Sequence, residues 1–94
     1  MNEEIFDSSG NVFSDLGFSP DEAAVLQMRA DLMADLRKLI KAKRLTQAKA
    51  AEILGVSQSR VSDLIRGKWD RFSLEMLITL ATKTGMRIRL LKAA

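Results

Sequence analysis

The sequence contains no cysteine, no histidine and no tyrosine, and only one proline and one tryptophan. Without cysteine the chain forms no disulfide and offers no thiolate to a metal, and the lack of histidine removes the other common zinc ligand. The same absences remove the usual parts of acid–base and nucleophilic catalytic sites. We therefore expect a protein that is not an enzyme and that uses no metal or cofactor.

Long apolar runs are also missing from the sequence. No stretch approaches the roughly 18 apolar residues that a membrane span requires. The acidic N-terminus lacks the basic and then apolar pattern of a secretory signal. We expect a cytoplasmic protein of one domain, of a size at which oligomerisation is a common aid to stability.

The net charge of +3 hides a division of the chain into two parts of opposite charge. Residues 1–35 carry eight acids and one base, a net charge of −7, whereas residues 36–94 carry fourteen bases and four acids, a net charge of +10. Such an asymmetry suggests a polyanionic partner for the second part and a basic partner for the first. The other interpretation is that the two parts attract each other within the fold.

The central stretch, residues 47–66, predicts two short helices joined by a tight turn. Thr46 and Ser57 are suited to N-cap these helices, and Gly55 is suited to the left-handed position after the first. Because so short a connection makes the helices cross steeply, small residues are expected where they touch: Ala50 and Ala51. The predicted inner face is apolar: Ile53, Leu54, Val56, Val61, Leu64 and Ile65. The outer face of the second helix is polar: Gln58, Ser59, Arg60, Ser62 and Asp63.

Two further helices are predicted on either side of this stretch. Residues 19–43 begin with Ser19 as N-cap, Pro20 at the first helical position and Glu22 to complete a capping box. A 3.6-residue period predicts the buried stripe of this helix: Val25, Met28, Leu32, Met33, Leu36, Leu39 and Ile40. The last helix is predicted over residues 73–84, with four buried residues: Leu74, Leu77, Ile78 and Ala81.

Residues 1–18 are predicted to form an N-terminal arm, of which Met1–Gly10 is expected to be mobile. The rest of the arm carries four apolar side chains: Val12, Phe13, Leu16 and Phe18. These side chains either pack on the protein's own helices or are held for a partner. Packing is favoured for some of them, because exposed phenylalanine lowers solubility.

Residues 86–91 alternate apolar with basic side chains, which is the period of a half-buried β-strand. One strand cannot form a sheet, so this strand must pair with Val12–Phe13, with its copy in a second subunit or with another protein. Pairing between subunits would give a two-fold dimer with three apolar residues at the interface: Met86, Ile88 and Leu90.

Two basic residues are hard to explain by folding alone. Lys49 and Arg60 each occupy the third position of a predicted motif helix. A cation there opposes the helix dipole by some tenths of a kcal/mol, whereas phosphate is favoured at the same helix end. This conflict indicates a nucleic-acid partner.

The central stretch resembles the helix-turn-helix of the lambda-repressor/Cro-like (XRE) family. Ala51, Gly55, Val61 and Leu64 fall where that motif has a small residue, a glycine and two buried aliphatic residues. The resemblance implies an all-α fold: a compact helical domain over residues 19–94, closed by the C-terminal strand. It also implies a protein that binds double-stranded DNA in the major groove and regulates transcription.

In the order of its elements over residues 11–92, the chain resembles more narrowly the HigA-like antitoxins, a branch of the XRE proteins. Such antitoxins are typically homodimers that repress their own operon and neutralise a small basic RelE/HigB-type toxin that cleaves mRNA. The resemblance implies association with the nucleoid through DNA. It also implies a toxin-binding surface on the arm, at Val12, Phe13, Leu16 and Phe18.

Position by position, Gln47 resembles a glutamine that contacts phosphate, while Gln58, Ser59 and Asp63 fall at positions that read base edges. Lys49 departs from a glutamate common in the family, and Asp63 departs from a neutral or basic residue. The expected DNA-contacting set is Gln47, Lys49, Ser57, Gln58, Ser59, Arg60, Ser62, Asp63, Arg66 and Lys68.

Other interpretations of the same residues stay open. One is a stand-alone XRE or phage-type regulator that shares the DNA chemistry but has no toxin. A second is a protein-interaction module that has lost DNA binding. The simplest is a plain helical hairpin whose polar face meets only water.

Overall fold

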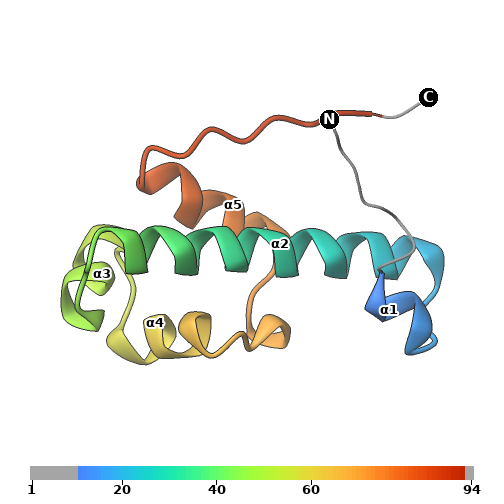
Figure 1. The fold of residues 1–94 in the computed structure, drawn as a ribbon, viewed down its shortest axis with the longest axis horizontal. Coiled ribbons are helices and arrows are strands. Elements are labelled where there is room, and N and C mark those ends of the chain that lie inside the picture. The colour runs from blue at the N-terminus through green and yellow to red at the C-terminus, as the bar shows by residue number, and fades with distance from the viewer. Residues whose placement is uncertain (1–10, 93–94) are drawn as a thin grey trace.

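Helix α2 (Pro20–Ala42) runs the length of the molecule and is the element on which the others assemble. The computed structural model describes residues 11–92, and within them five further helices are present: α1 (Val12–Asp15), α3 (Gln47–Leu54), α4 (Gln58–Ile65), the 3-10 helix η3 (Trp69–Arg71) and α5 (Leu74–Lys83). Helix α5 lies along one side of α2, α4 lies along the other side, and α1 packs near its N-terminal end (Figure 1). Helix α3 packs against α4 and α5. The predicted all-α fold is therefore confirmed.

Side-chain caps set the starts of these helices as the sequence predicted. The Ser19 hydroxyl accepts the backbone N–H of Glu22 at 3.3 Å, and the Glu22 carboxylate accepts the backbone N–H of Ser19 at 3.2 Å. This reciprocal pair satisfies two donors that the first turn of α2 would otherwise leave exposed. Thr46, Ser57 and Ser73 cap α3, α4 and α5 through their hydroxyls in the same manner.

The main core lies where α3, α4 and α5 meet the C-terminal half of α2. Its buried residues are Met33, Leu36, Ile40, Ala50, Ala51, Leu54, Val61, Leu64, Phe72, Leu77, Leu80 and Ala81. Eight of these twelve residues belong to the predicted motif stretch or to the predicted stripe of α2. Phe72, which follows η3, is 1% exposed and closes the core between α4 and α5.

The predicted stripe of α2 was wrong in its first half. Val25 and Met28 are 41% and 47% exposed, and Ala23 and Leu26 are buried instead. A period of 3.6 residues does not say which of two neighbouring stripes meets a partner. The partner is α1, and its Phe13 packs against Ala23 and Leu26.

Two residues of the predicted motif face also lie nearer the surface than expected. Ile53 is 40% exposed and Ile65 is 38% exposed, whereas their neighbours Leu54 and Leu64 are buried. In α3 and α4 the buried positions are those that face the main core, where the two helices meet α2 and α5. In α5, Leu74 and Ile78 are half-buried and Leu80 takes a core position that the sequence did not predict.

The described part of the arm is a helical turn docked on α2. Asn11 caps α1 and its amide donates to the backbone carbonyl of Ala23 at 3.2 Å. The Phe13 ring packs edge-to-face against Trp69, with ring centroids 5.4 Å apart, and against Phe18 at 6.2 Å. The expected mobility of Met1–Gly10 falls outside the described residues.

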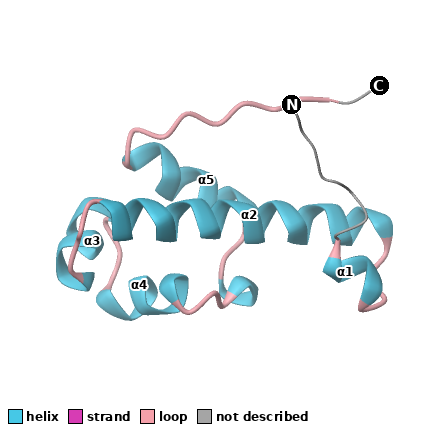
Figure 2. Ribbon diagram, viewed as in Figure 1, coloured by secondary structure: helices cyan, strands magenta, loops and turns pink. Residues whose placement is uncertain are grey.

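The C-terminal strand predicted over residues 86–91 is absent. No strand occurs in residues 11–92, and the segment after α5 runs as an extended loop above α5 and α2 (Figure 2). The pairing proposed with Val12–Phe13 is wrong because those residues are helical, so they present no strand edge. Leu90 and Leu91 are 80% and 85% exposed. Among the helices described, none is long and apolar enough to cross a membrane.

The docking of α1 predicts a clear difference between two apolar residues of the arm. Replacing Phe13, which is 5% exposed, by alanine should lower the free energy of unfolding by about 3 kcal/mol, because the ring leaves a cavity beneath Trp69. Leu16→Ala is the control: its side chain is 67% exposed, and the change should stay within about 0.5 kcal/mol. Urea unfolding of both variants checks this, and equal effects would mean that α1 is not docked.

Candidate nucleic-acid interface

The turn between α3 and α4 is built around Gly55. Its backbone has φ +70° and ψ +33°, a left-handed conformation in which an L side chain is strained. The backbone N–H groups of Gly55 and Val56 both donate to the carbonyl of Ala51, at 2.8 and 3.1 Å. Ser57 follows at once and caps α4 by accepting the backbone N–H of Arg60 at 3.1 Å. The predicted left-handed glycine and the predicted cap are both confirmed.

Helix α5 secures this turn from outside the motif. The Lys83 ammonium donates to the backbone carbonyl of Leu54 at 3.3 Å, at the C-terminal end of α3. The contact satisfies a carbonyl that has no partner within the helix, and a cation there complements the helix dipole. Sequence reasoning did not predict this role for Lys83, because it is 29 residues away from Leu54 in the chain.

Helix α4 is held by two buried residues and presents a polar outer face. Val61 and Leu64 are 0% and 1% exposed and anchor the helix in the core. Gln58, Ser59 and Arg66 are exposed, and four more of the predicted set are half-buried: Arg60, Ser62, Asp63 and, beyond the helix, Lys68. The exposed part of the predicted reading face is thus concentrated at the N-terminal turn of α4, where helices of this motif contact base edges.

Arg60 is turned partly toward its own protein. One guanidinium nitrogen donates to the backbone carbonyl of Arg71 at 3.0 Å, and the guanidinium carbon lies 5.6 Å from the centre of the Phe72 ring. These contacts join α4 to η3 and the residue after it. The remaining donors of Arg60 stay available to a ligand, because a guanidinium has five N–H groups.

Asp63 faces two cations rather than open solvent. Its carboxylate lies 3.5 Å from a guanidinium nitrogen of Arg71 and 4.0 Å from the Lys68 ammonium, and its side chain is only 17% exposed. The sequence predicted Asp63 to read base edges, but its carboxylate oxygens face cations of its own chain. Arg71 was not in the expected DNA-contacting set. It follows Lys68 by three residues and shares Asp63 with it as an ion-pair partner.

The conflict expected at Lys49 is relieved locally. Its ammonium forms an ion pair with the Glu52 carboxylate at 3.0 Å, one helical turn along α3. Both side chains are more than 60% exposed, so the pair contributes little to stability. Gln47, the first residue of α3, is also exposed. Lys49 therefore remains accessible to a phosphate, but its position no longer argues for one.

The residues predicted to bind a toxin or a second subunit lie partly at the surface and partly in the interior. In the arm, Val12 and Leu16 are exposed, Phe18 is half-buried and Phe13 is a core residue. In the C-terminal segment, Met86 is half-buried against the main core, whereas Ile88 and Leu90 are exposed. Among the residues that the structure describes, no group of three acidic side chains is placed to hold a metal ion.

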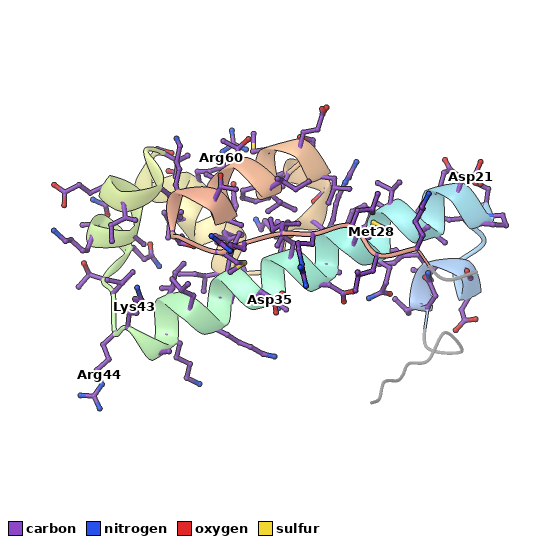
Figure 3. The ribbon with its side chains drawn as sticks, turned by 90° about the horizontal axis from the view of Figure 1, so that it is seen from above. Asp21, Met28, Asp35, Lys43, Arg44 and Arg60 are labelled. Atoms are coloured by element: carbon purple, nitrogen blue, oxygen red, sulfur yellow. The ribbon has the colours of Figure 1, made fainter. Side chains whose placement is uncertain are left out.

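Opposite charges gather at opposite ends of α2. Figure 3 shows Asp21 at one end of this helix and Lys43 and Arg44 at the other, with the Arg44 side chain directed away from the fold. The separation is not complete, because Asp31 and Asp35 of α2 line the same hollow as Arg89 of the C-terminal segment.

Comparison with known proteins places this arrangement in a family. The family model described as a helix-turn-helix domain matches residues 12–91. A solved structure of an XRE-family transcriptional regulator is similar to this chain, with 33% sequence identity and a TM-score of 0.73, over 78% of this chain and 82% of that one. No curated protein matches the chain. The two matches span the capped turn at Gly55, the buried anchors of α4 and the supporting helices, and the chain belongs to the XRE family of helix-turn-helix transcriptional regulators.

Proposed function

We propose that the protein is a repressor that reads an operator through α4 and controls the operon that encodes it. The observation that carries this proposal is the N-terminal turn of α4, where Gln58 and Ser59 are exposed beside a capped helix end. A glutamine at such a position can make a bidentate contact to adenine in the major groove. Binding of this kind would place the protein on the nucleoid.

Residues around α4 are suited to contact phosphates on either side. Gln47 and Lys49 stand at the start of α3, Ser57 at the start of α4, and Arg66 and Lys68 just beyond its end. Backbone N–H groups at the starts of helices favour anions, and basic side chains add charge-assisted contacts. Such contacts would fix the register of α4 without reading sequence.

A second role, as an antitoxin that neutralises a basic RelE/HigB-type toxin, is supported by the surface at the other end of α2. Val12 and Leu16 of α1 are 52% and 67% exposed, and Val25 of α2 is 41% exposed. Acidic residues accompany these apolar side chains: Asp15, Asp21 and Glu22. Exposed apolar groups with a rim of one charge are typical of protein–protein interfaces.

A homodimer is supported by the C-terminal segment. Ile88 and Leu90 are 39% and 80% exposed although both are large apolar residues, and Leu91 beside them is 85% exposed. Contact with a second copy would remove this apolar surface from water. Two copies related by a two-fold axis would also present two α4 helices to the two halves of a symmetric operator.

A stand-alone regulator without a toxin is the second candidate, and the similarity to an XRE-family regulator over 82% of that chain favours it. The neighbouring reading frame distinguishes the two candidates. It should encode a small basic RelE-like protein if this chain is an antitoxin, and it should not if the chain is a stand-alone regulator. A protein-interaction module differs from both, because it would not bind DNA at low salt.

Base reading by α4 predicts that Gln58→Ala and Lys68→Gln have different effects. Gln58→Ala should weaken binding to the operator by about 1–3 kcal/mol and leave random duplex DNA almost unaffected. Lys68→Gln should weaken both DNAs alike, because phosphates carry no sequence. Fluorescence anisotropy with the protein's own upstream region and a scrambled duplex measures this, and an equal effect of Gln58→Ala on both DNAs would argue against the proposed register.

The ion pairs of Asp63 predict a change in selectivity. Asp63→Asn frees Lys68 and Arg71 and removes a negative charge next to the interface, so affinity for random DNA should rise several-fold and the ratio of operator to random affinity should fall. Asp35→Asn is the matched control, since it removes the same charge from an exposed position of α2. A similar rise in both variants would mean that net charge alone is responsible.

The antitoxin role predicts that Val12→Arg with Leu16→Arg abolishes capture of the co-expressed toxin while operator binding and thermal unfolding remain unchanged. Both side chains are exposed, so the fold should tolerate the charges that repel a basic partner. Thr79→Arg, at an exposed position of α5, is the control. Pull-down of the neighbouring gene product checks this, and capture by the double variant would place the toxin site elsewhere.

A further inference from the structure

The C-terminal half of α2 carries cations that no acid in the described part of the chain neutralises. Lys38 and Lys41 are exposed and Arg37 is half-buried. The ion pairs formed within residues 11–92 use other cations: Lys49, Lys68 and Arg71. Because cations at the end of a helix complement its dipole, charge alone would not distinguish a folding role from a binding role.

The shape around these cations distinguishes the two roles. Arg37, Lys38 and Lys41 line an open groove whose remaining walls are apolar: Ala34, Ile40 and Ile65. The groove therefore lies between α2 and the C-terminal end of α4. An apolar floor with a basic rim suits a sugar–phosphate backbone, which offers deoxyribose to the floor and phosphate oxygens to the rim.

Ile65 joins this groove to the proposed reading face. It follows Gln58 by seven residues and Ser62 by three, so all three lie on the same side of α4, and Ile65 is 38% exposed. The groove thus begins where the polar face of α4 ends. When a helix occupies the major groove, the phosphate backbones run along the two rims of that groove.

Arg37 also reaches the turn that follows α4. Its guanidinium nitrogen lies 3.3 Å from the position that a Cβ on Gly67 would occupy, and Gly67 has a left-handed φ of +72°. The absence of a side chain at Gly67 leaves room for the guanidinium beside the C-terminal end of α4. Arg37 is in this way positioned by the fold, whereas Lys38 and Lys41 are exposed at the rim of the groove.

The turn after α2 adds an independent observation. Arg44 has φ +54° and is the only residue other than glycine with a positive φ in the described part of the chain. A glycine would be less strained in this conformation. Arg44 is nevertheless exposed, and its side chain points away from the fold (Figure 3). The positive φ ends α2, where the backbone N–H of Leu45 donates to the carbonyl of Ile40 at 3.0 Å, and it leaves the cation at the surface beside the groove.

We propose that the groove between α2 and α4, lined by Arg37, Lys38 and Lys41, holds the DNA phosphate backbone at one rim of the major groove that α4 occupies, and that Arg44 extends this contact. The inference rests on the proposed operator binding and adds a second phosphate-binding surface outside the helix-turn-helix. An acidic protein segment is the other class of ligand that a basic groove could hold. The uniform rim of cations and the continuity with the face of α4 favour DNA.

The experiment measures the salt dependence of DNA binding by the full chain carrying Lys38→Gln and Lys41→Gln. Each lost phosphate contact should reduce the slope of log K against log salt by about 0.9, so the double variant should lose about 1.8. Affinity for operator and random DNA should fall by the same factor. The matched control is Arg87→Gln with Lys92→Gln, which removes the same charge from exposed positions outside the groove and should leave the slope unchanged.

Two further measurements localise the contact. A duplex with neutral methylphosphonates along one rim should bind the wild type more weakly than the unmodified duplex, and this difference should be smaller for the double variant, which keeps only Arg37 and Arg44 at that rim. Arg44→Gly should raise the thermal unfolding temperature, because it relieves the left-handed strain, and should still lower the salt slope by about 0.9.

The results separate this inference from the function on which it rests. Suppose that the wild type binds its operator. If the double variant then keeps the full salt slope, or if the control variant loses as much slope as the double variant, the groove holds no phosphate. Operator reading by α4 would still stand. If the wild type binds no DNA at low salt, both are overturned. Loss of an acidic protein partner with an unchanged slope would assign the groove to that partner and also overturn the inference.

Discussion

The left-handed turn at Gly55 is the constraint on which the interface depends. Only one residue, Val56, separates this glycine from the cap of α4, so the direction of α4 is set by two backbone hydrogen bonds to Ala51 and by the φ of +70°. The Lys83 ammonium donates to the last carbonyl of α3 and ties the turn to α5. Because this bond arises from a distant helix, the angle between α3 and α4 is supported by the whole core and not by the motif alone.

Helix α2 separates the two proposed functions in space. Its 23 residues span about 34 Å at 1.5 Å per residue. This distance exceeds the screening length of about 8 Å at physiological salt several-fold. On the proposed functions, a toxin bound near α1 and DNA bound near α4 would therefore occupy surfaces too far apart for direct electrostatic interaction.

The polar surface of α4 is organised by ion pairs and hydrogen bonds within the protein. Asp63 holds Lys68 and Arg71, while Arg60 is held by the carbonyl of Arg71 and the ring of Phe72. Long basic side chains lose conformational entropy when they bind, and partial ordering in the free protein reduces that loss. This arrangement leaves Gln58 and Ser59 as the exposed polar residues of the first turn, and it ties η3 to α4.

Local chemistry in the sequence was sufficient for the helix starts, the left-handed turn at Gly55 and the buried anchors Val61 and Leu64. Each depends on residues within a few positions of one another: a hydroxyl accepts a nearby N–H, a glycine adopts a positive φ, and apolar residues repeat with the helical period. The membership in the XRE family follows from the same short stretch. Local chemistry could not predict which residues from distant parts of the chain pack against one another in the core.

Only the tertiary structure decided which apolar stripe of α2 is buried, because α1 covers Ala23 and Leu26 and leaves Val25 and Met28 in solvent. It also decided that residues 86–91 form no strand, since hydrogen bonds to a second strand must come from elsewhere in the chain or from another molecule, and Val12–Phe13 is helical. The roles of Arg60, Asp63 and Arg71 depend on contacts across the turn at η3. The alternation of apolar and charged residues can be read within one segment. Burial and strand pairing depend on which other segments the fold places beside it.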